Sequence, residues 1–248
     1  MPVRLLILGG TGEAAALARA IDAAFGGRVA IISSLAGLAG VPDLPGRVRV
    51  GGFGGAEGLA EYIKREGIDA VIDATHPFAT RISAHAEAAC ASLGVARLVL
   101  ARPAWIAAEG DRWIEVADMA AAAGLVASLG RRAFLTVGAG EVRAFAAVAE
   151  VWFLVRLLKA EILPLPAHAV VVARPPFTIA SERRLMQEQR IDVVVSKNAG
   201  GGATYAKIEA ARALGLPVLM IRRPPPPAGP PVADIHAAVA WLGGRIKG

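Results

Sequence analysis

The stretch that decides the fold class is Val3–Ala15, which reads VRLLILGGTGEAA. An apolar run predicts a buried strand, and it passes directly into the pattern G-x-G-x-x-A and an alanine-rich helix. Gly10 permits a tight turn, Gly12 lets the backbone approach a diphosphate, and Ala15 allows close helix–strand packing. In this context the pattern favours a dinucleotide held at the helix N-terminus over a purely structural turn. The residues expected to bind the cofactor here are Gly9, Gly10, Thr11, Gly12, Glu13 and Ala14.

Apolar β-branched runs alternate with helical stretches along the whole chain, which predicts parallel sheets with crossover helices. A proline-rich run at 222–231 predicts an extended connector. The expected strands are 3–8, 28–33, 47–50, 70–73, 95–100, 112–116, 133–137, 152–158, 169–173, 192–196 and 217–221, and the expected helices are 13–25, 55–66, 77–93, 118–129, 141–149, 181–190, 203–214 and 233–243.

A faint internal repeat suggests two related halves. IDAVI at Ile68–Ile72 and IDVVV at Ile191–Val195 each precede a helix and then a strand that ends in Arg-Pro. A second G-x-G turn stands at Gly138–Gly140. We therefore expect an α/β fold of two Rossmann-like parallel-sheet domains, 1–130 binding NADP and 131–248 gripping the substrate. The alternative is that βαβ units resemble one another without any repeat.

Composition narrows the class of protein. Basic residues (27 Lys and Arg, net charge +6) are scattered through the chain, which argues against a nucleic-acid groove and suits a polyanionic small ligand. No apolar run reaches the length of a membrane span, and no signal peptide is evident, so we expect a cytoplasmic protein. The single cysteine, Cys90, is expected in the core. The histidines lack metal-ligand spacing, so no metal site is expected.

The end of the second expected strand indicates which cofactor binds. An NAD site needs an acidic residue there for the ribose 2′-hydroxyl, but the chain has Ser33 and Ser34, whose hydroxyls can bond a 2′-phosphate. NADPH is therefore favoured over NADH, although ordinary turn chemistry would also explain the serines. Gly51 and Gly52 follow the third strand, where a glycine-rich loop suits backbone lying against a ligand. A plain flexible loop is the alternative.

Two further strand ends carry candidate functional groups. Thr75 and His76 follow the fourth strand, and His76 is expected near a helix N-cap with Pro77 as the first helical residue. His76 could orient substrate or donate a proton, or simply cap the helix. SKNAGGGATYAK at Ser196–Lys207 predicts an anion-binding turn or, alternatively, a loop with a solvated lysine. The residues expected to bind substrate there are Lys197, Asn198, Gly201, Thr204 and Tyr205.

Taken together, these stretches resemble the precorrin-6A reductase family of cobalamin biosynthesis, including its cobalt-precorrin counterpart. The resemblance implies two Rossmann-like domains with the active site in the cleft between them. It also implies NADPH as reductant and a polycarboxylate tetrapyrrole as substrate, so that arginines and Lys197 would pair with carboxylates. The matching stretches are Leu6–Ala14, Ser33–Gly37, Val50–Gly55, Ile68–Ala79, Gly110–Trp113, Ile191–Gly201 and Ala203–Lys207.

One position departs from the family. Leu38 stands where an arginine often follows the SLAG stretch, so the preference for NADPH must rest on the two serines or on Arg47 or Arg49. The implied mechanism is hydride transfer to a conjugated imine-type system with protonation at the neighbouring carbon. The candidate catalytic residues are His76, Lys197 and Tyr205, and water is an alternative proton source.

Two other functions remain open. Another NADPH-dependent reductase of a small carbonyl or imine would oxidise the cofactor without a tetrapyrrole. A non-enzymatic NADPH sensor would bind the cofactor without oxidising it. The sequence does not indicate the oligomeric state.

Overall fold

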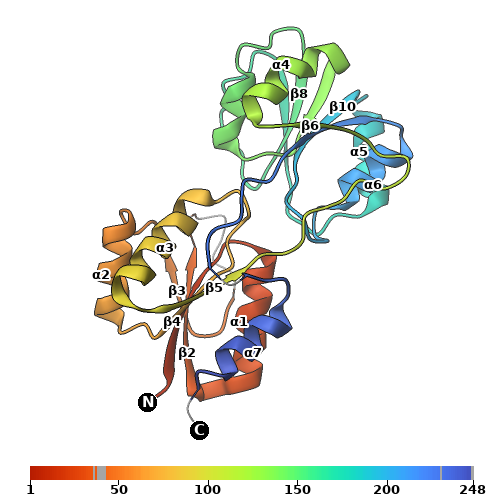
Figure 1. Cartoon of the computed structure of the whole chain (residues 1–248). Helices are drawn as coiled ribbons and strands as arrows, with labels where there is room; N and C mark the ends of the chain where they lie inside the picture. The colour runs from red at the N-terminus through yellow and green to blue at the C-terminus, as the bar shows by residue number, and fades with distance from the viewer. Residues whose placement is uncertain (36, 38–42, 230, 247–248) are drawn as a thin grey trace. The chain divides into compact units, whose positions relative to one another are not determined.

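The computed structural model describes residues 1–35, 37, 43–229 and 231–246. Two residues named in the sequence analysis lie outside the described residues. They are Ala36 of the SLAG stretch and Leu38, the position that departs from the family pattern. The chain divides into a first unit, Met1–Pro103 with Pro224–Gly248, and a second unit, Ala104–Arg223. Figure 1 shows the helices and strands of both units, coloured by residue number along the chain. In the described part of the chain, no helix combines the length and apolar character that crossing a bilayer requires.

The first unit is built on a six-stranded parallel sheet with strand order β12-β5-β4-β1-β2-β3. Helices α1 and α7 cover one face, and α2 and α3 cover the other (Figure 1). Its elements are β1 (Val3–Leu8), α1 (Gly12–Phe25), the 3-10 helix η1 (Gly26–Arg28), β2 (Val29–Leu35), β3 (Arg47–Val50), α2 (Ala56–Glu66), β4 (Ala70–Asp73), α3 (Thr80–Leu93), β5 (Ala96–Leu100), β12 (Pro231–Val232) and α7 (Ile235–Gly243).

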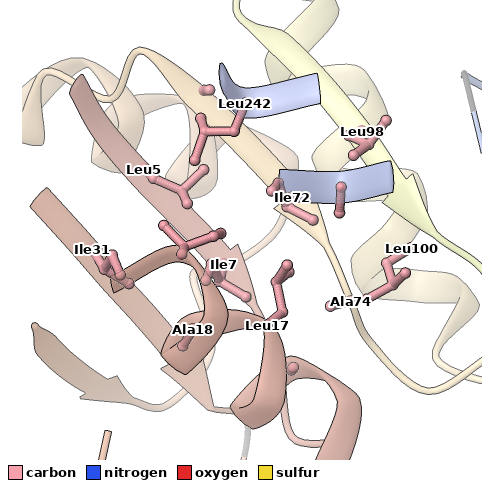
Figure 2. Packing of buried hydrophobic residues seen from close by; sticks show 14 of the residues in the cluster. Leu5, Ile7, Leu17, Ala18, Ile31, Ile72, Ala74, Leu98, Leu100 and Leu242 are labelled. Carbon is pink, nitrogen blue, oxygen red and sulfur yellow. The ribbon is translucent and has the colours of Figure 1, made fainter. Parts of the chain in front are cut away.

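Alternation along β1 explains how one strand serves both cores of this unit. Leu5 and Ile7 face α1 and α7, whereas Leu6 and Leu8 face α2 and α3, and all four are at most 1% exposed. Figure 2 shows Leu242 of α7 in the same cluster as Leu5, so the end of the chain completes the core of its beginning. Burial of each such leucine contributes roughly 1.5–3 kcal/mol.

The second unit repeats this architecture with the strand order β6-β11-β10-β7-β8-β9, again wholly parallel. Residues of α5 and α6 pack with the central strands in its principal core cluster. Its elements are β6 (Arg112–Val116), α4 (Met119–Leu129), β7 (Arg132–Leu135), the 3-10 helix η2 (Ala139–Phe145), β8 (Trp152–Leu157), β9 (His168–Val172), α5 (Ile179–Glu188), β10 (Val193–Lys197), α6 (Ala206–Ala213) and β11 (Pro217–Ile221).

The two units exchange their sixth strands. Each sheet contains the Rossmann order 3-2-1-4-5-6, but β6 follows β5 in the chain and pairs with β11. Conversely, β12 follows β11 and pairs with β5. The chain therefore leaves the first unit after its fifth strand, forms the second unit, and returns to supply the missing edge strand and α7.

The structure confirms an α/β fold with two Rossmann-like parallel sheets, but the chain divides elsewhere than at 130/131. The exchange places β6 and α4 in the second unit and β12 and α7 in the first. The repeated segments do occupy equivalent places, since β4 and β10 are the fourth strands of their sheets and β5 and β11 the fifth. Each Arg-Pro marks the point where the chain leaves a unit.

Three local predictions were wrong. Helix α3 begins at Thr80 rather than at Pro77. The helix expected at 141–149 is the 3-10 helix η2. The run expected to be wholly connector ends in the two-residue strand β12, where the edge position tolerates proline because its missing N–H is not needed on the outer side.

Candidate functional site

The first glycine turn has the geometry that its sequence predicts. Gly10 has φ +107°, a conformation that a side chain would strain, and α1 begins at Gly12. Close packing falls on Gly9 rather than on Ala15, because a Cβ at Gly9 would approach the Ala14 Cβ to 3.1 Å. Thr11 Oγ1 caps the helix by accepting from Ala14 N at 3.1 Å. The turn therefore points the N-terminus of α1 towards the carboxyl edge of the sheet.

A small crevice of about 50 Å³ lies beyond the carboxyl ends of β4 and β5, between the starts of α1 and α7, and next to the point between β1 and β4 where the strand order reverses. This is the position at which open α/β sheets bind their ligands. Thr11 Oγ1 also donates to Ala74 O at 3.0 Å and so ties the two strand ends together. Glu13 forms an ion pair with Arg102 at 2.5 Å, which offsets the negative charge beside the helix N-terminus. Residues lining the crevice include Thr11, Glu13, Thr75, Pro77 and Arg102.

The ends of β2 and β3 form a second part of this site. Arg49 Nη1 donates to Ser34 Oγ at 2.8 Å and to Gly51 O at 2.9 Å, and Nη2 donates to Gly52 O at 2.9 Å. Its guanidinium lies 3.8 Å from the Phe53 ring centroid. Burial is the main cause that lowers the pKa of Arg49 below its usual value. The side chain is thus held in place at the strand ends, where sequence analysis named it only as one of two basic alternatives.

Ser33 and Arg47 are placed differently from Ser34 and Arg49. Ser33 is 3% exposed, and its hydroxyl has no hydrogen-bond partner among the described residues. Arg47 Nη2 pairs with Glu66 at 2.5 Å on the exposed side of β3, so its charge is already compensated. Of the residues proposed to replace the missing family arginine, the structure brings Ser34 and Arg49 together.

The DATHPF turn is organised around Asp73. The buried Asp73 Oδ1 accepts from Thr75 N at 3.1 Å and from Thr75 Oγ1 at 2.7 Å, while Oδ2 has no partner in the described chain. His76 is half-buried, and its Nδ1 accepts from Phe78 N at 3.3 Å. Because α3 starts four residues later, His76 lies in a turn and not at the expected N-cap position.

In the second unit, Lys197 of the predicted anion-binding turn forms an ion pair with a carboxylate of the same unit. Lys197 Nζ donates to both carboxylate oxygens of Glu141, at 3.0 and 2.8 Å. Glu141 Oε2 also accepts from Gly138 N at 2.7 Å, so the carboxylate fills the second G-x-G turn. Lys197 is therefore paired with a carboxylate of its own unit, which lies in the turn at Gly138 and not in the glycine loop that follows Lys197.

Asn198 and Tyr205 are also engaged within the second unit. Asn198 Oδ1 accepts from Trp105 N at 2.8 Å, and Nδ2 donates to Trp105 O at 2.9 Å. The Tyr205 hydroxyl accepts from Arg212 Nη2 at 2.9 Å, and Arg212 also holds Asp111 through two bonds. The asparagine and the tyrosine therefore organise loops. Gly201 O accepts from Trp105 Nε1 at 2.8 Å, and Thr204 O from Lys207 Nζ at 3.2 Å.

A buried cluster of charged side chains lies near Lys207, and the sequence pattern did not predict it. Arg156 and Glu182 form a 2.6 Å ion pair with side chains 9% and 2% exposed. Lys207, 5% exposed, lies near this pair, and burial together with the Arg156 charge lowers its pKa to about 7. The burial of these charges could not be predicted from the pattern of apolar residues. Glu182 and Lys207 lie in the first turns of α5 and α6, where polar residues are usually exposed.

The expected core cysteine lies in the core and adds no reactive thiol. Cys90 is buried, and desolvation raises the pKa of its thiol to about 11, which leaves it a poor nucleophile. Across the described residues, no three His, Cys, Asp or Glu side chains gather where they could hold a metal ion.

Comparisons with known proteins agree over almost the whole chain. The family model of precorrin-6x reductase CbiJ/CobK matches residues 4–243. A precorrin-6A reductase of Rhodococcus erythropolis is 52% identical over 97% of each chain. One of Mycobacterium tuberculosis H37Rv is 48% identical over 97% of this chain and 98% of the relative. A solved structure named CobK precorrin-6A reductase superposes with a TM-score of 0.91 at 44% identity, covering 98% and 96% of the two chains.

Proposed function

The chain belongs to the precorrin-6x reductase CbiJ/CobK family, and from this premise we propose that it reduces precorrin-6A to precorrin-6B with NADPH. The observation that carries the reaction is the near full-length identity to relatives named precorrin-6A reductase. A relative named cobalt-precorrin-6A reductase, from Salmonella typhimurium, is only 29% identical. This difference favours a substrate without cobalt.

The choice of NADPH rests on the ends of β2 and β3. A 2′-phosphate needs cationic and hydroxyl donors, and Arg49 and Ser34 are bonded to each other at 2.8 Å there. No acidic residue stands within 31–37, where an NAD enzyme would need one. Stacking on Phe53 holds the guanidinium without an acidic partner to neutralise it. Arg49 thus takes the role that the missing family arginine would play.

The turn at Gly9–Glu13 fits a diphosphate. Within the described part of the chain, no acceptor is recorded for the N–H groups of Gly12 and Glu13 at the start of α1. These donors and the helix dipole suit a bound anion, and Arg102 compensates the Glu13 carboxylate nearby. When bound, the nicotinamide cofactor supplies the hydride. The chain positions it and excludes water, which accounts for most of the protein's share in such reactions.

His76 is the proposed proton donor in the first unit. Because Nδ1 accepts the Phe78 N–H, a neutral ring carries its proton on Nε2, the atom that could donate it. For Lys197 the proposal shifts from binding substrate carboxylates to holding Glu141 in the second glycine turn. Tyr205, whose hydroxyl accepts from Arg212, is proposed to order the loop rather than to donate a proton.

The reaction is tested by mixing the protein with NADPH and precorrin-6A and following the visible spectrum of the macrocycle. Loss of the precorrin-6A spectrum together with loss of NADPH absorbance is expected. Oxidation of NADPH by a small imine without a tetrapyrrole would favour the rival reductase. Binding without oxidation would favour a sensor.

The cofactor proposal is tested by Arg49→Ala. Loss of charge-assisted bonds to the 2′-phosphate should lower the ratio of kcat/KM for NADPH to that for NADH by about ten- to a hundredfold. Arg28→Ala is the matched control, because Arg28 is an exposed arginine just before the start of β2, the neighbouring strand, and so lies at the opposite end of that strand from Ser34. An unchanged ratio in Arg49→Ala would remove Arg49 from the cofactor site.

A further inference from the structure

The chain passes between the two units twice, at Pro103–Ala104 and at Arg223–Pro224. A connection of this kind is free to bend only over the residues that neither unit holds. If the last residue bonded to one unit and the first residue bonded to the other are close together in sequence, few backbone torsions between them can change. The contacts on each side of the two crossings therefore decide how freely the units can move.

The first connection is held on both sides. On the side of the first unit, Arg102 pairs with Glu13 at 2.5 Å. On the side of the second unit, both backbone groups of Trp105 bond to the Asn198 side chain, and Trp105 Nε1 donates to Gly201 O. Only Pro103 and Ala104 lie between these fixed residues.

The second connection is held in the same manner. Arg223 Nε donates to Asn198 O at 3.3 Å, and Nη2 donates to Ala199 O at 2.9 Å. On the side of the first unit, Ala228 O accepts from Arg97 Nη2. The residues between are the four prolines 224–227, which have fixed φ angles and form a stiff extended segment.

Both connections are thus bound to one loop, 198–201, at the carboxyl end of β10. Asn198 is 9% exposed, its side-chain amide bonds Trp105, and its carbonyl bonds Arg223. The residue that sequence analysis assigned to substrate joins the first connection to the second.

We propose that Asn198, Trp105 and Arg223 are positioning residues, which together with the four prolines limit how far the two units can move relative to each other. For its effect on the reaction, this inference rests on the proposed function, with the cofactor held by the first unit. Where the substrate contacts the second unit while the first holds the cofactor, a looser connection lowers kcat, because hydride transfer depends steeply on the separation of the reacting atoms. Affinity for NADPH, which the first unit provides alone, stays unchanged.

The first test loosens the proline segment without removing any hydrogen bond. Pro225 and Pro226 are exposed, and the double variant Pro225→Gly/Pro226→Gly gives the backbone new freedom. The control is Pro164→Gly/Pro166→Gly, two exposed prolines in a loop inside the second unit. The readout is the distribution of distances between spin labels at Lys64→Cys and Gln187→Cys.

Labelling is specific because the natural Cys90 is buried and has a raised thiol pKa. We expect a broader distance distribution and a kcat about three- to tenfold lower in Pro225→Gly/Pro226→Gly, with an unchanged NADPH Kd. The control should match the parent protein in all three. An unchanged distance distribution in Pro225→Gly/Pro226→Gly would overturn the role of the prolines. This distribution can be measured without any cofactor, so the result does not depend on the proposed function.

The second test removes a hydrogen-bond clamp. Arg223→Ala is compared with Arg112→Ala, because Arg112 also donates to a backbone carbonyl of the second unit, Gly215 O at 2.8 Å. A broader distribution and a lower kcat are expected only for Arg223→Ala, with partial rescue by Arg223→Lys. In Asn198→Ala, a raised KM for precorrin-6A without broadening would mean that Asn198 binds substrate, and this result would overturn the proposal.

Discussion

The two units share a strand order and a glycine turn, yet the carboxyl edges of their sheets are used differently. In the first unit, the turn at Gly10 leads into α1 and leaves backbone donors at the helix start. In the second unit, the corresponding turn at Gly138 is filled by Glu141, which also neutralises Lys197. The first edge has backbone donors without a recorded acceptor among the described residues, whereas the second edge binds a carboxylate of its own chain.

Two sheets of the same strand order therefore differ in what occupies the glycine turn, and the proposed ligand site lies on only one of them. A carboxylate supplied by the chain costs less entropy than a bound ligand and is present at all times, so the turn becomes structural. The buried ion pair of Arg156 and Glu182 is another charged group of the second unit whose partner comes from the same chain. Substitutions at the second edge should therefore change stability, and substitutions at the first edge should change cofactor binding.

The largest effect is expected for Glu182→Ala. Removing the carboxylate leaves Arg156 and the nearby Lys207 without a buried counter-charge, which should lower the free energy of unfolding by about 3–5 kcal/mol. Urea denaturation measures the loss, and the NADPH Kd of the folded protein should not change. The control is Glu188→Ala on the same helix, whose ion pair with Arg184 is also 2.6 Å long but exposed. It should cost less than about 0.5 kcal/mol.

Gly10→Ala should have the next largest effect, and on binding rather than stability. A side chain at φ +107° strains the turn by about 1–3 kcal/mol, which corresponds to roughly 5- to 150-fold weaker NADPH binding by calorimetry. Gly138→Ala is the matched change in the second unit, where φ is −70° and the added Cβ would lie 3.1 Å from Glu141 Oε2, so its cost falls on the stability of that turn and not on NADPH binding. Equal losses of NADPH affinity in both variants would contradict the division of roles between the units.

A third effect concerns the pH dependence of stability. The pKa of Lys207 is lowered to about 7 in the folded protein, from about 10.5 in the unfolded chain. Between these values the unfolded state binds more protons, so this lysine makes stability rise with pH, by at most about 1.4 kcal/mol per unit. Below pH 7 the burial penalty is present in full.

Lys207→Met should remove this slope and stabilise the protein most at the acid end. Denaturation midpoints of the parent and the variant at pH 6, 7, 8 and 9 give the measurement. Curves that stay parallel over this range would mean that Lys207 remains charged in the folded state. The variant should also leave the NADPH Kd unchanged, because the lysine lies in the second unit.

Much of the fold could be predicted because the information is local. The strands at Val3–Leu8, Arg47–Val50, Ala70–Asp73, Arg112–Val116 and Pro217–Ile221 were predicted to the residue, because apolar β-branched runs bounded by turns specify them. Helix α3 was misplaced, since proline often opens helices and nothing local shows that His76 and Pro77 form a turn first.

The candidate site was predictable in the first unit and not in the second. Gly10 and Ser34 act through backbone geometry and strand position, which the sequence pattern encodes. Lys197 and Asn198 act through their partners, and these partners, Glu141 and Trp105, lie 56 and 93 residues away. Spacing alone cannot show whether a lysine after a strand meets a ligand or a carboxylate of its own chain.

The sequence by itself determined a parallel α/β protein, the positions of most strands, and a tight glycine turn between the first strand and the first helix. Only the tertiary structure decided that β6 and β12 exchange sheets, because a short edge strand specifies that it pairs but not with which neighbour. Both sheets offer an equivalent open edge beside β5 and β11. The chain fills each with the strand from the far side of an Arg-Pro crossing, and so ties the two units together at two points.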